Sequence, residues 1–215
     1  MSKRRKWFIA IPLILFVMLA ICIQAKLSVP LESWAYSETV EGMSPVLTSV
    51  MKGFTFLGES AVVITFCLAL FIVSKLRKTV ALPVSTAVIL SGICNVALKH
   101  LFARNRPNIL RLINETGYSF PSGHAMINAS LYVILILLIC RYFKNKFLKT
   151  SLCAICIMLI VMIGYSRIYL GVHYAGDVLA GWLFGSALSM MVYFRWDNKL
   201  SLNNQKTALA YKDNF

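Results

Sequence analysis

The stretch Ser166-Arg-Ile-Tyr-Leu-Gly-Val-His-Tyr-Ala-Gly-Asp177 lies between two apolar runs, residues 149–166 and 174–194. Each run is close to the roughly 20 residues that an α-helix needs to cross a bilayer. The stretch itself carries a guanidinium, an imidazole and a carboxylate, although the chain has only three histidines and eight acidic residues. The pattern therefore predicts two membrane-spanning helices joined by a short turn with chemically useful side chains.

Two residues of this stretch suggest catalysis. If the chain is helical from His173 onward, His173 and Asp177 stand four residues apart on one helix face. A carboxylate there can hold one imidazole nitrogen and leave the other free to attack or to accept a proton. The alternative is structural, with Arg167 and Asp177 as an ion pair and His173 as a hydrogen-bonded interface residue. A catalytic interpretation therefore requires matching groups elsewhere in the chain.

The composition is that of a membrane protein. Of the 215 residues, 59% are hydrophobic and 14% are charged, whereas soluble domains average about 45–50% and 25%. The formal net charge is +14, but the basic residues stand in short clusters beside the apolar runs, as is typical of topology signals and anionic-lipid contacts. Membrane lipids are therefore the expected partners, and nucleic acid is not.

Six apolar runs predict an all-α, polytopic membrane protein with six transmembrane helices in a single domain, residues 1–215. The predicted spans are 7–25, 54–74, 79–102, 124–142, 149–166 and 174–194. Residues 26–53 form a more polar first outer loop, in which residues 43–51 are expected to be a short amphipathic helix at the interface. The first run also fits a cleaved signal peptide, but the cleavage pattern around Ala25 is weak, so a retained helix is preferred.

Basic residues are divided unequally between the two sides of this arrangement. Fifteen of the 22 Lys and Arg residues lie on the side of the chain ends, and seven lie on the other side. By the positive-inside rule, residues 1–6 and 196–215 are cytoplasmic ends, with 200–215 as a frayed polar tail. The loops 103–123 and 166–173 then face the extracytoplasmic side together.

A second polar cluster lies on this predicted outer side, at the end of the third span. Lys99 and Arg106 are seven residues apart, so on a helix they share one face before Pro107 ends the helix. The structural alternative is a basic cap whose side chains reach toward the interface. Lys99 fits that alternative less well, because apolar positions follow it.

The third cluster is Pro121-Ser-Gly-His124, directly before the fourth span. Pro, Ser and Gly at a helix start are ordinary capping residues. The same geometry exposes backbone N–H groups to an anion, while Ser122 adds a hydroxyl and Gly123 allows close approach. His124 has no packing reason to be histidine, which favours a functional interpretation.

Together the clusters contain the groups that a phosphate monoester requires. They are the cations Lys99, Arg106 and Arg167, the neutral donors Ser122 and Gly123, the histidines His124 and His173, and the carboxylate of Asp177. Several charge-assisted donors can surround a phosphate dianion and stabilise it as the phosphoryl group transfers. No metal or other cofactor is expected, because carboxylates and histidines are too few.

The six cysteines, Cys153 and Cys156 included, are expected to pack as small hydrophobes.

These residues form three motifs by which the chain resembles the type 2 phosphatidic acid phosphatase superfamily of integral-membrane lipid phosphatases. The first family motif, Lys-x6-Arg-Pro, matches Lys99, Arg106 and Pro107. The second matches Pro121-Ser-Gly-His124, and the third, Ser-Arg-x5-His-x3-Asp, matches Ser166 to Asp177. Every motif position agrees in order and spacing, and the resemblance covers about residues 50–195.

The resemblance implies a role for each motif residue. His173 would be the nucleophile that forms a phosphohistidine, Asp177 would orient it, and His124 would protonate the leaving oxygen. The residues implied to hold the phosphoryl oxygens are Lys99, Arg106, Ser122, Gly123 and Arg167. The choice of His173 is also supported by its spacing to Asp177, since His124 has no acid four residues on. Arg167 is then a phosphate ligand rather than the salt-bridge partner of Asp177.

The expected function is metal-independent hydrolysis of lipid phosphate monoesters or diphosphates at the extracytoplasmic face of the cytoplasmic membrane. The resemblance suggests phosphatidic acid, phosphatidylglycerol phosphate or undecaprenyl diphosphate as substrates. One alternative is a lipid phosphotransferase that passes the phosphoryl group to another acceptor. Another is a non-catalytic phospholipid-binding or transport protein, which the complete set of nucleophile, acid and orienting residue disfavours, because binding needs only the cations. A haloperoxidase is excluded by the membrane architecture.

Overall fold

The protein is described by a computed structural model, which covers the backbone of residues 2–108 and 110–212 and the side chains of the same residues up to Lys199. Its regular structure within these residues is helical. The α-helices are α1 (Lys3–Gln24), α2 (Val29–Glu41), α3 (Pro45–Leu57), α4 (Ser60–Ile72), α5 (Leu82–Phe102), α6 (Gly123–Tyr142), α7 (Lys146–Tyr169) and α8 (Ala175–Lys212). A 3-10 turn (Ser74–Leu76) and a π-helical turn (Arg77–Ala81) lead into α5.

Five segments are long and apolar enough to cross a membrane. They are α1, the segment Ser74–Phe102 that includes α5, α6, α7, and α8 as far as Lys199. The pair α3 and α4 makes a sixth span if it is counted as one helix bent by 47°. The predicted all-α, multi-pass architecture is therefore confirmed.

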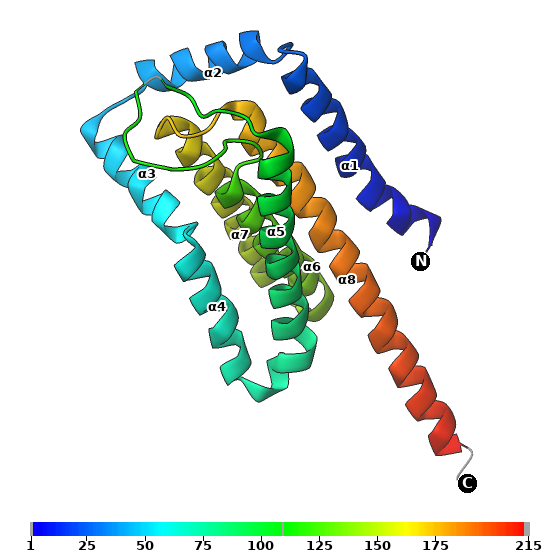
Figure 1. The fold of residues 1–215 in the computed structure, drawn as a ribbon. Helices are drawn as coiled ribbons and strands as arrows, with labels where there is room; N and C mark the ends of the chain where they lie inside the picture. Colours follow the sequence, from blue (N-terminus) through cyan, green and yellow to red (C-terminus); the bar gives the residue numbers. More distant parts are fainter. Residues whose placement is uncertain (1, 109, 213–215) are drawn as a thin grey trace.

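The spans form one bundle, with α2 lying across one of its ends (Figure 1). Helix α6 packs against α5, α7 and α8, and α1 packs along α8. Phe16 of α1 lies edge-on to Phe184 of α8, with ring centroids 4.9 Å apart. The end of the bundle that α2 crosses also carries the long loop between α5 and α6 and the turn between α7 and α8 (Figure 1).

Small residues let α6 and α8 approach closely. A Cβ atom at Gly185 would stand 2.2 Å from the carbonyl oxygen of Met126, so no larger residue fits without a shift of the backbone. Two hydroxyls bond across the same contact, because Ser130 donates to the Gly185 carbonyl at 3.0 Å and Ser189 donates to the Ser130 carbonyl at 2.6 Å. This contact fixes the start of α6 next to the start of α8.

The first outer loop differs from the prediction. Residues 29–41 form α2, and the predicted interfacial helix at residues 43–51 is the first part of the longer helix α3. If the bent pair α3 and α4 is counted as one span, that span begins at Pro45 rather than at residue 54. The helix starts there because Ser44 caps it and proline suits its first turn, and it bends at Gly58, whose carbonyl accepts a hydrogen bond from Asn128 of α6 at 3.0 Å.

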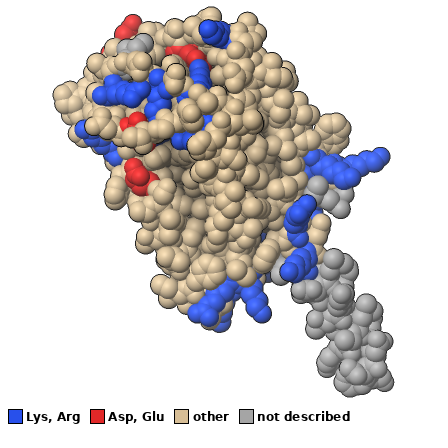
Figure 2. Space-filling view, viewed as in Figure 1, with Lys and Arg blue, Asp and Glu red and all other residues tan. Residues whose placement is uncertain are grey.

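Charged side chains gather at the two ends of the bundle, with an uncharged band between them on the face shown in Figure 2. At the end with the termini, Asp197 of α8 pairs with Arg5 at 2.8 Å and also with Arg141. The backbone of the predicted frayed tail, residues 200–215, is helical as far as Lys212, where α8 ends, and residues 213–215 lie outside the described residues.

Candidate active site

His173 lies in the turn between α7 and α8, where the three motif segments converge. Helix α8 begins only at Ala175, so the condition under which His173 and Asp177 would share a helix face, a helix from His173 onward, is not met. The carboxylate of Asp177 turns back and accepts a hydrogen bond from the Tyr174 backbone N–H at 2.9 Å, one half of a capping box that starts the helix there. This same bend of the chain brings Asp177 Oδ2 to 3.6 Å from His173 Nδ1.

A serine outside the predicted set stands between the two groups. Ser119 Oγ donates to Asp177 Oδ2 at 2.5 Å and lies 3.2 Å from His173 Nδ1. Ser119 lies two positions before Pro121, the first residue of the second motif, and no rule of spacing marks it. The imidazole is therefore oriented jointly by a serine and a carboxylate, both fully buried.

Burial lowers the pKa of His173 to about 4, because desolvation disfavours the imidazolium more strongly than Asp177 favours it. The positive charge of Arg106 acts in the same direction as burial. The imidazole is therefore neutral near pH 7, which is the form that can act as a nucleophile.

Arg104 is a second residue that the sequence analysis did not single out. Its guanidinium bridges two buried carboxylates, Asp177 at 2.6 Å and Glu32 of α2 at 2.7 Å, and lies over the Tyr174 ring at 4.1 Å. Burial by itself lowers the pKa of Arg104, but the two carboxylates raise it above its ordinary value. Through Arg104, the helix α2 is connected to the carboxylate beside His173.

The shared helix face predicted for Lys99 and Arg106 is not formed. Helix α5 ends at Phe102, and Ala103 adopts a left-handed conformation with φ 43° that turns the chain away. Arg106 is instead buried in the loop, where its Nη1 lies 3.2 Å from His173 Nε2. Lys99, in the last turn of α5, is still close enough to Arg106 and Arg167 for the positive charges of the three side chains to repel one another.

The Arg106 guanidinium is held by loop carbonyls. It donates to the carbonyl oxygens of Thr116 at 2.9 Å and of Gly117 and Val172 at 3.0 Å each. Burial lowers the pKa of Arg106, and Arg167 adds to that effect while Glu115 opposes it. Each of the three guanidinium nitrogens of Arg106, a predicted ligand of phosphate, therefore donates to a protein carbonyl oxygen.

Arg167 is fully buried and pairs with Glu115 of the outer loop, not with Asp177. Its guanidinium also donates to the hydroxyl of Thr55 in α3. The Glu115 carboxylate lies 3.7 Å from Arg106 as well, so it contacts two predicted phosphate ligands at once. Burial by itself raises the pKa of Glu115. The positive charge of Arg167 and the hydrogen bond from it lower that pKa by more, so the pKa of Glu115 is below its ordinary value.

The motif Pro121–His124 forms the N-terminal end of α6, as predicted. Ser122 is the N-cap residue; its backbone N–H donates to the Asp177 carbonyl at 3.0 Å, and its buried hydroxyl has no hydrogen-bond partner. Gly123 packs closely against α5, because a Cβ there would stand 3.0 Å from Asn95 Oδ1. The site therefore offers an unused hydroxyl at a positive helix end.

His124 has an acid partner that its own helix does not reveal. Glu59, at the bend between α3 and α4, places Oε1 3.5 Å from His124 Nε2, without hydrogen-bond geometry. His124 is disfavoured as the nucleophile partly because no acid stands four residues after it. That statement is true of its own helix, but Glu59 of another segment lies near it. The sequence could not pair the two, since they are 65 positions apart.

Comparison with known proteins agrees with this geometry. The family model of the PAP2 superfamily matches residues 80–200, which is more than half of the chain. The chain belongs to the PAP2 superfamily. This assignment confirms the resemblance and the predicted enzyme class, a lipid phosphatase.

Two curated relatives and one solved structure illustrate the PAP2 match. Phosphatidylglycerophosphatase B of Bacillus subtilis is 34% identical over 75% of this chain and 81% of that protein. Undecaprenyl-diphosphatase of Sulfolobus acidocaldarius is 28% identical over 87% of this chain and 90% of that protein. The crystal structure of a transmembrane PAP2-type phosphatidylglycerolphosphate phosphatase from Bacillus subtilis has a TM-score of 0.80 and 27% identity, covering 90% of this chain and 97% of that one.

Proposed function

We propose that this PAP2 protein hydrolyses lipid phosphate monoesters or diphosphates through a phosphohistidine on His173. The observation that carries the proposal is the setting of His173. The neutral imidazole is oriented by Asp177 and Ser119 on its Nδ1 side and faces Arg106 on its Nε2 side. A nucleophile thus stands against the cations that would hold the group it attacks.

The proposed first step forms a bond between His173 Nε2 and phosphorus while the bond from phosphorus to the leaving oxygen breaks. His173 carries its proton on Nδ1, where Ser119 Oγ can accept it, so the lone pair is on Nε2. Arg106 Nη1 lies 3.2 Å from Nε2 and would turn from it to the phosphoryl oxygens before His173 attacks. His124 gives a proton to the leaving oxygen, and its Nε2 has no hydrogen-bond partner in the protein, so that atom is free to face this oxygen. Asp177 stabilises the positive charge that develops on His173.

In the second step water attacks phosphorus and the N–P bond breaks. His124, now neutral, takes a proton from that water, and His173 returns as a neutral imidazole. Throughout, Lys99, Arg106 and Arg167, with Ser122 and the N–H groups at the start of α6, would stabilise charge on the phosphoryl oxygens. Positioned cations would supply the charge stabilisation in both steps, so no cofactor is included.

The substrate phosphate must displace Glu115 from the basic cluster. In the structure this carboxylate contacts both Arg106 and Arg167. A phosphate dianion carries more charge than a carboxylate and can accept bidentate hydrogen bonds from each arginine. Its entry would return Glu115 to solvent, which its partly exposed position in the loop allows.

The proposed substrates are lipids of the phosphatidic acid, phosphatidylglycerol phosphate or undecaprenyl diphosphate class. The names of the two curated relatives support this range. The apolar spans would hold the lipid tail, and the unequal distribution of basic residues supports cytoplasmic termini and a site at the extracytoplasmic face of the cell membrane.

The test is phosphate release from these lipids by purified protein, with and without a chelator. We expect His173→Ala to abolish release, and an acid-labile phosphoenzyme to accumulate in the wild type and not in the variant. Full activity of His173→Ala would refute the mechanism. Phosphorylated acceptor in place of free phosphate would identify a transferase, and binding without any phosphoenzyme would identify a non-catalytic protein.

A further inference from the structure

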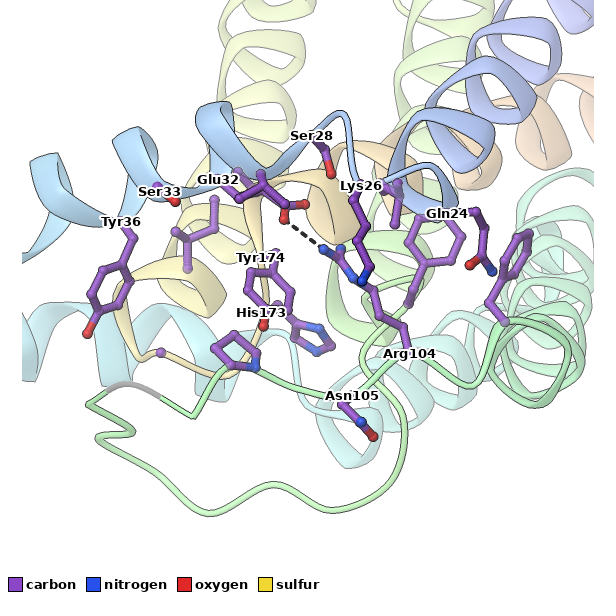
Figure 3. A pocket seen from close by; sticks show the side chains of 18 of the residues that line it. Gln24, Lys26, Ser28, Glu32, Ser33, Tyr36, Arg104, Asn105, His173 and Tyr174 are labelled. Atoms are coloured by element: carbon purple, nitrogen blue, oxygen red, sulfur yellow. Dashed lines mark hydrogen bonds and ion pairs between the residues drawn. The ribbon is translucent and has the colours of Figure 1, made fainter.

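A cavity of about 600 Å³ opens beside His173, between α2, the end of α1 and the chain that follows α5 (Figure 3). His173 and Tyr174 line it from below, and Glu32 reaches toward Arg104 across it (Figure 3). The cavity lining contains none of Lys99, Arg106 and Arg167, the cations proposed to bind phosphate. The cavity is therefore available to the part of a substrate that is not the phosphate.

Three polar atoms among the residues that line this cavity are buried without a hydrogen-bond partner. They are Ser28 Oγ, Glu32 Oε1 and Tyr36 Oη. Ser28 and Glu32 are each only 7% exposed. Buried polar atoms are normally paired, because an unpaired one loses its hydration without compensation. Three such atoms around one cavity indicate that a polar ligand completes them.

The kinds of these atoms indicate the chemistry of the ligand. The Glu32 carboxylate oxygen can only accept, so it needs a donor, whereas the hydroxyls of Ser28 and Tyr36 can donate or accept. Burial raises the pKa of Tyr36, which keeps its hydroxyl protonated. Groups that both donate and accept hydrogen bonds, such as alcohol hydroxyls, match this set.

The charges next to Glu32 favour an uncharged hydrogen-bond donor at that position, while Lys26 on the same cavity can face an anionic phosphodiester elsewhere in the headgroup. A phosphate placed against Glu32 would meet a like charge, and an ammonium group there would meet Arg104 and Lys26. Arg104 already forms ion pairs with both Glu32 and Asp177, so its charge is largely neutralised and would attract a further anion only weakly. A hydroxyl-bearing, uncharged group meets neither repulsion.

We propose that this cavity is a headgroup subsite that binds free hydroxyl groups on the alcohol side of the lipid phosphate, through Ser28, Glu32 and Tyr36. The inference rests on the proposed function, because attack at His173 is what would bring that alcohol to the cavity. It makes the outer helix α2 the element that selects the headgroup. A lipid phosphate whose headgroup carries a free hydroxyl is thus preferred to one without.

The experiment compares two substrates in detergent micelles. Phosphatidylglycerol phosphate carries a free hydroxyl on the glycerol that bears the terminal phosphate, and phosphatidic acid has none. The test variant is Ser28→Ala combined with Tyr36→Phe, which removes two hydroxyls and leaves Glu32 and Arg104 in place. The control is Ser37→Ala, on the same helix, whose exposed hydroxyl bonds to the Trp34 carbonyl at 2.8 Å.

We expect the double variant to lower kcat/KM for phosphatidylglycerol phosphate about 5- to 25-fold, mainly through KM, as one or two lost hydrogen bonds would. Its kcat/KM for phosphatidic acid should stay within about twofold of the wild type, as should both values for Ser37→Ala. An equal loss on both substrates, or no loss on either, would overturn the subsite and leave the proposed function standing. No phosphate release from either lipid by the wild type would overturn the proposed function, and the subsite with it.

Discussion

Glu115 contacts two of the three cations that are proposed to bind phosphate, Arg106 at 3.7 Å and Arg167 in a closer ion pair. Its pKa is below the ordinary value, so it is ionised at neutral pH. At the scale of the residue, a carboxylate thus takes the place of the anion that the site is proposed to bind. Competition between the two is the direct consequence.

Glu115→Gln should therefore bind inorganic phosphate more tightly than the wild type. An amide cannot hold the two arginines as firmly, so less interaction has to be broken before phosphate enters. We expect the inhibition constant of phosphate to fall roughly tenfold, equivalent to about 1.4 kcal/mol. The control is Glu38→Gln, an exposed carboxylate of α2. Weaker or unchanged inhibition in Glu115→Gln would contradict the competition.

The protonation of His173 gives a second prediction at this scale. Because burial disfavours its charged form, the imidazole should stay neutral as the pH falls from 7 and take up a proton only through about pH 4. Nitrogen-15 chemical shifts of labelled histidine would follow the titration, and the missing signal in His173→Gln would assign it. A midpoint at the ordinary value of about 6.5 would contradict a desolvated nucleophile.

At the scale of the element, the contact between α6 and α8 decides the position of the site. Gly185 lets the two helices touch, because a Cβ there would stand 2.2 Å from the Met126 carbonyl. The start of α6 is in turn bonded to Asp177 through the Ser122 N–H. Forcing the helices apart would move the proposed acid and the proposed nucleophile relative to each other.

Gly185→Ala should therefore lower both the thermal stability and the activity of the purified protein. Overpacking typically costs about 1–3 kcal/mol. The matched control is Gly53→Ala in α3, where an added Cβ meets no atom within 4 Å and alanine favours the helix. Melting curves in detergent would compare the two variants. Equal melting temperatures would show that the helices can separate at little cost.

At the scale of the whole molecule, the charged ends set the orientation in the membrane. The basic excess at the end with the termini predicts that this end faces the cytoplasm. Introduced cysteines can test the sidedness, since Glu38 and Lys78 are both exposed and lie on opposite predicted sides.

We expect Glu38→Cys to react with a membrane-impermeant maleimide in intact cells, and Lys78→Cys to react only after the cells are permeabilised. The wild type, with its six cysteines, measures the background. The reverse labelling pattern would place the site in the cytoplasm and would contradict the proposed location. A topology inverted in this way would leave the chemistry of His173 unaffected.

The sequence by itself determined the spans, the membrane class and the three motifs. A helix in a lipid bilayer satisfies its own backbone hydrogen bonds, so length and apolar composition are enough to predict it. The motif residues His124, His173 and Asp177 were likewise visible, because their spacing is local. Boundaries set by capping, such as the start of α3 at Pro45, were predicted less well.

The tertiary structure alone decided the partners of these residues. Four contacts at the site join segments that are distant in the chain. They are Glu115 with Arg167, Arg104 with Glu32, Ser119 with Asp177, and Glu59 with His124. Such pairs depend on how a loop turns and on how α2 and α3 pack at the end of the bundle. No local pattern encodes those geometries, because each pair forms only when separate helices have come together.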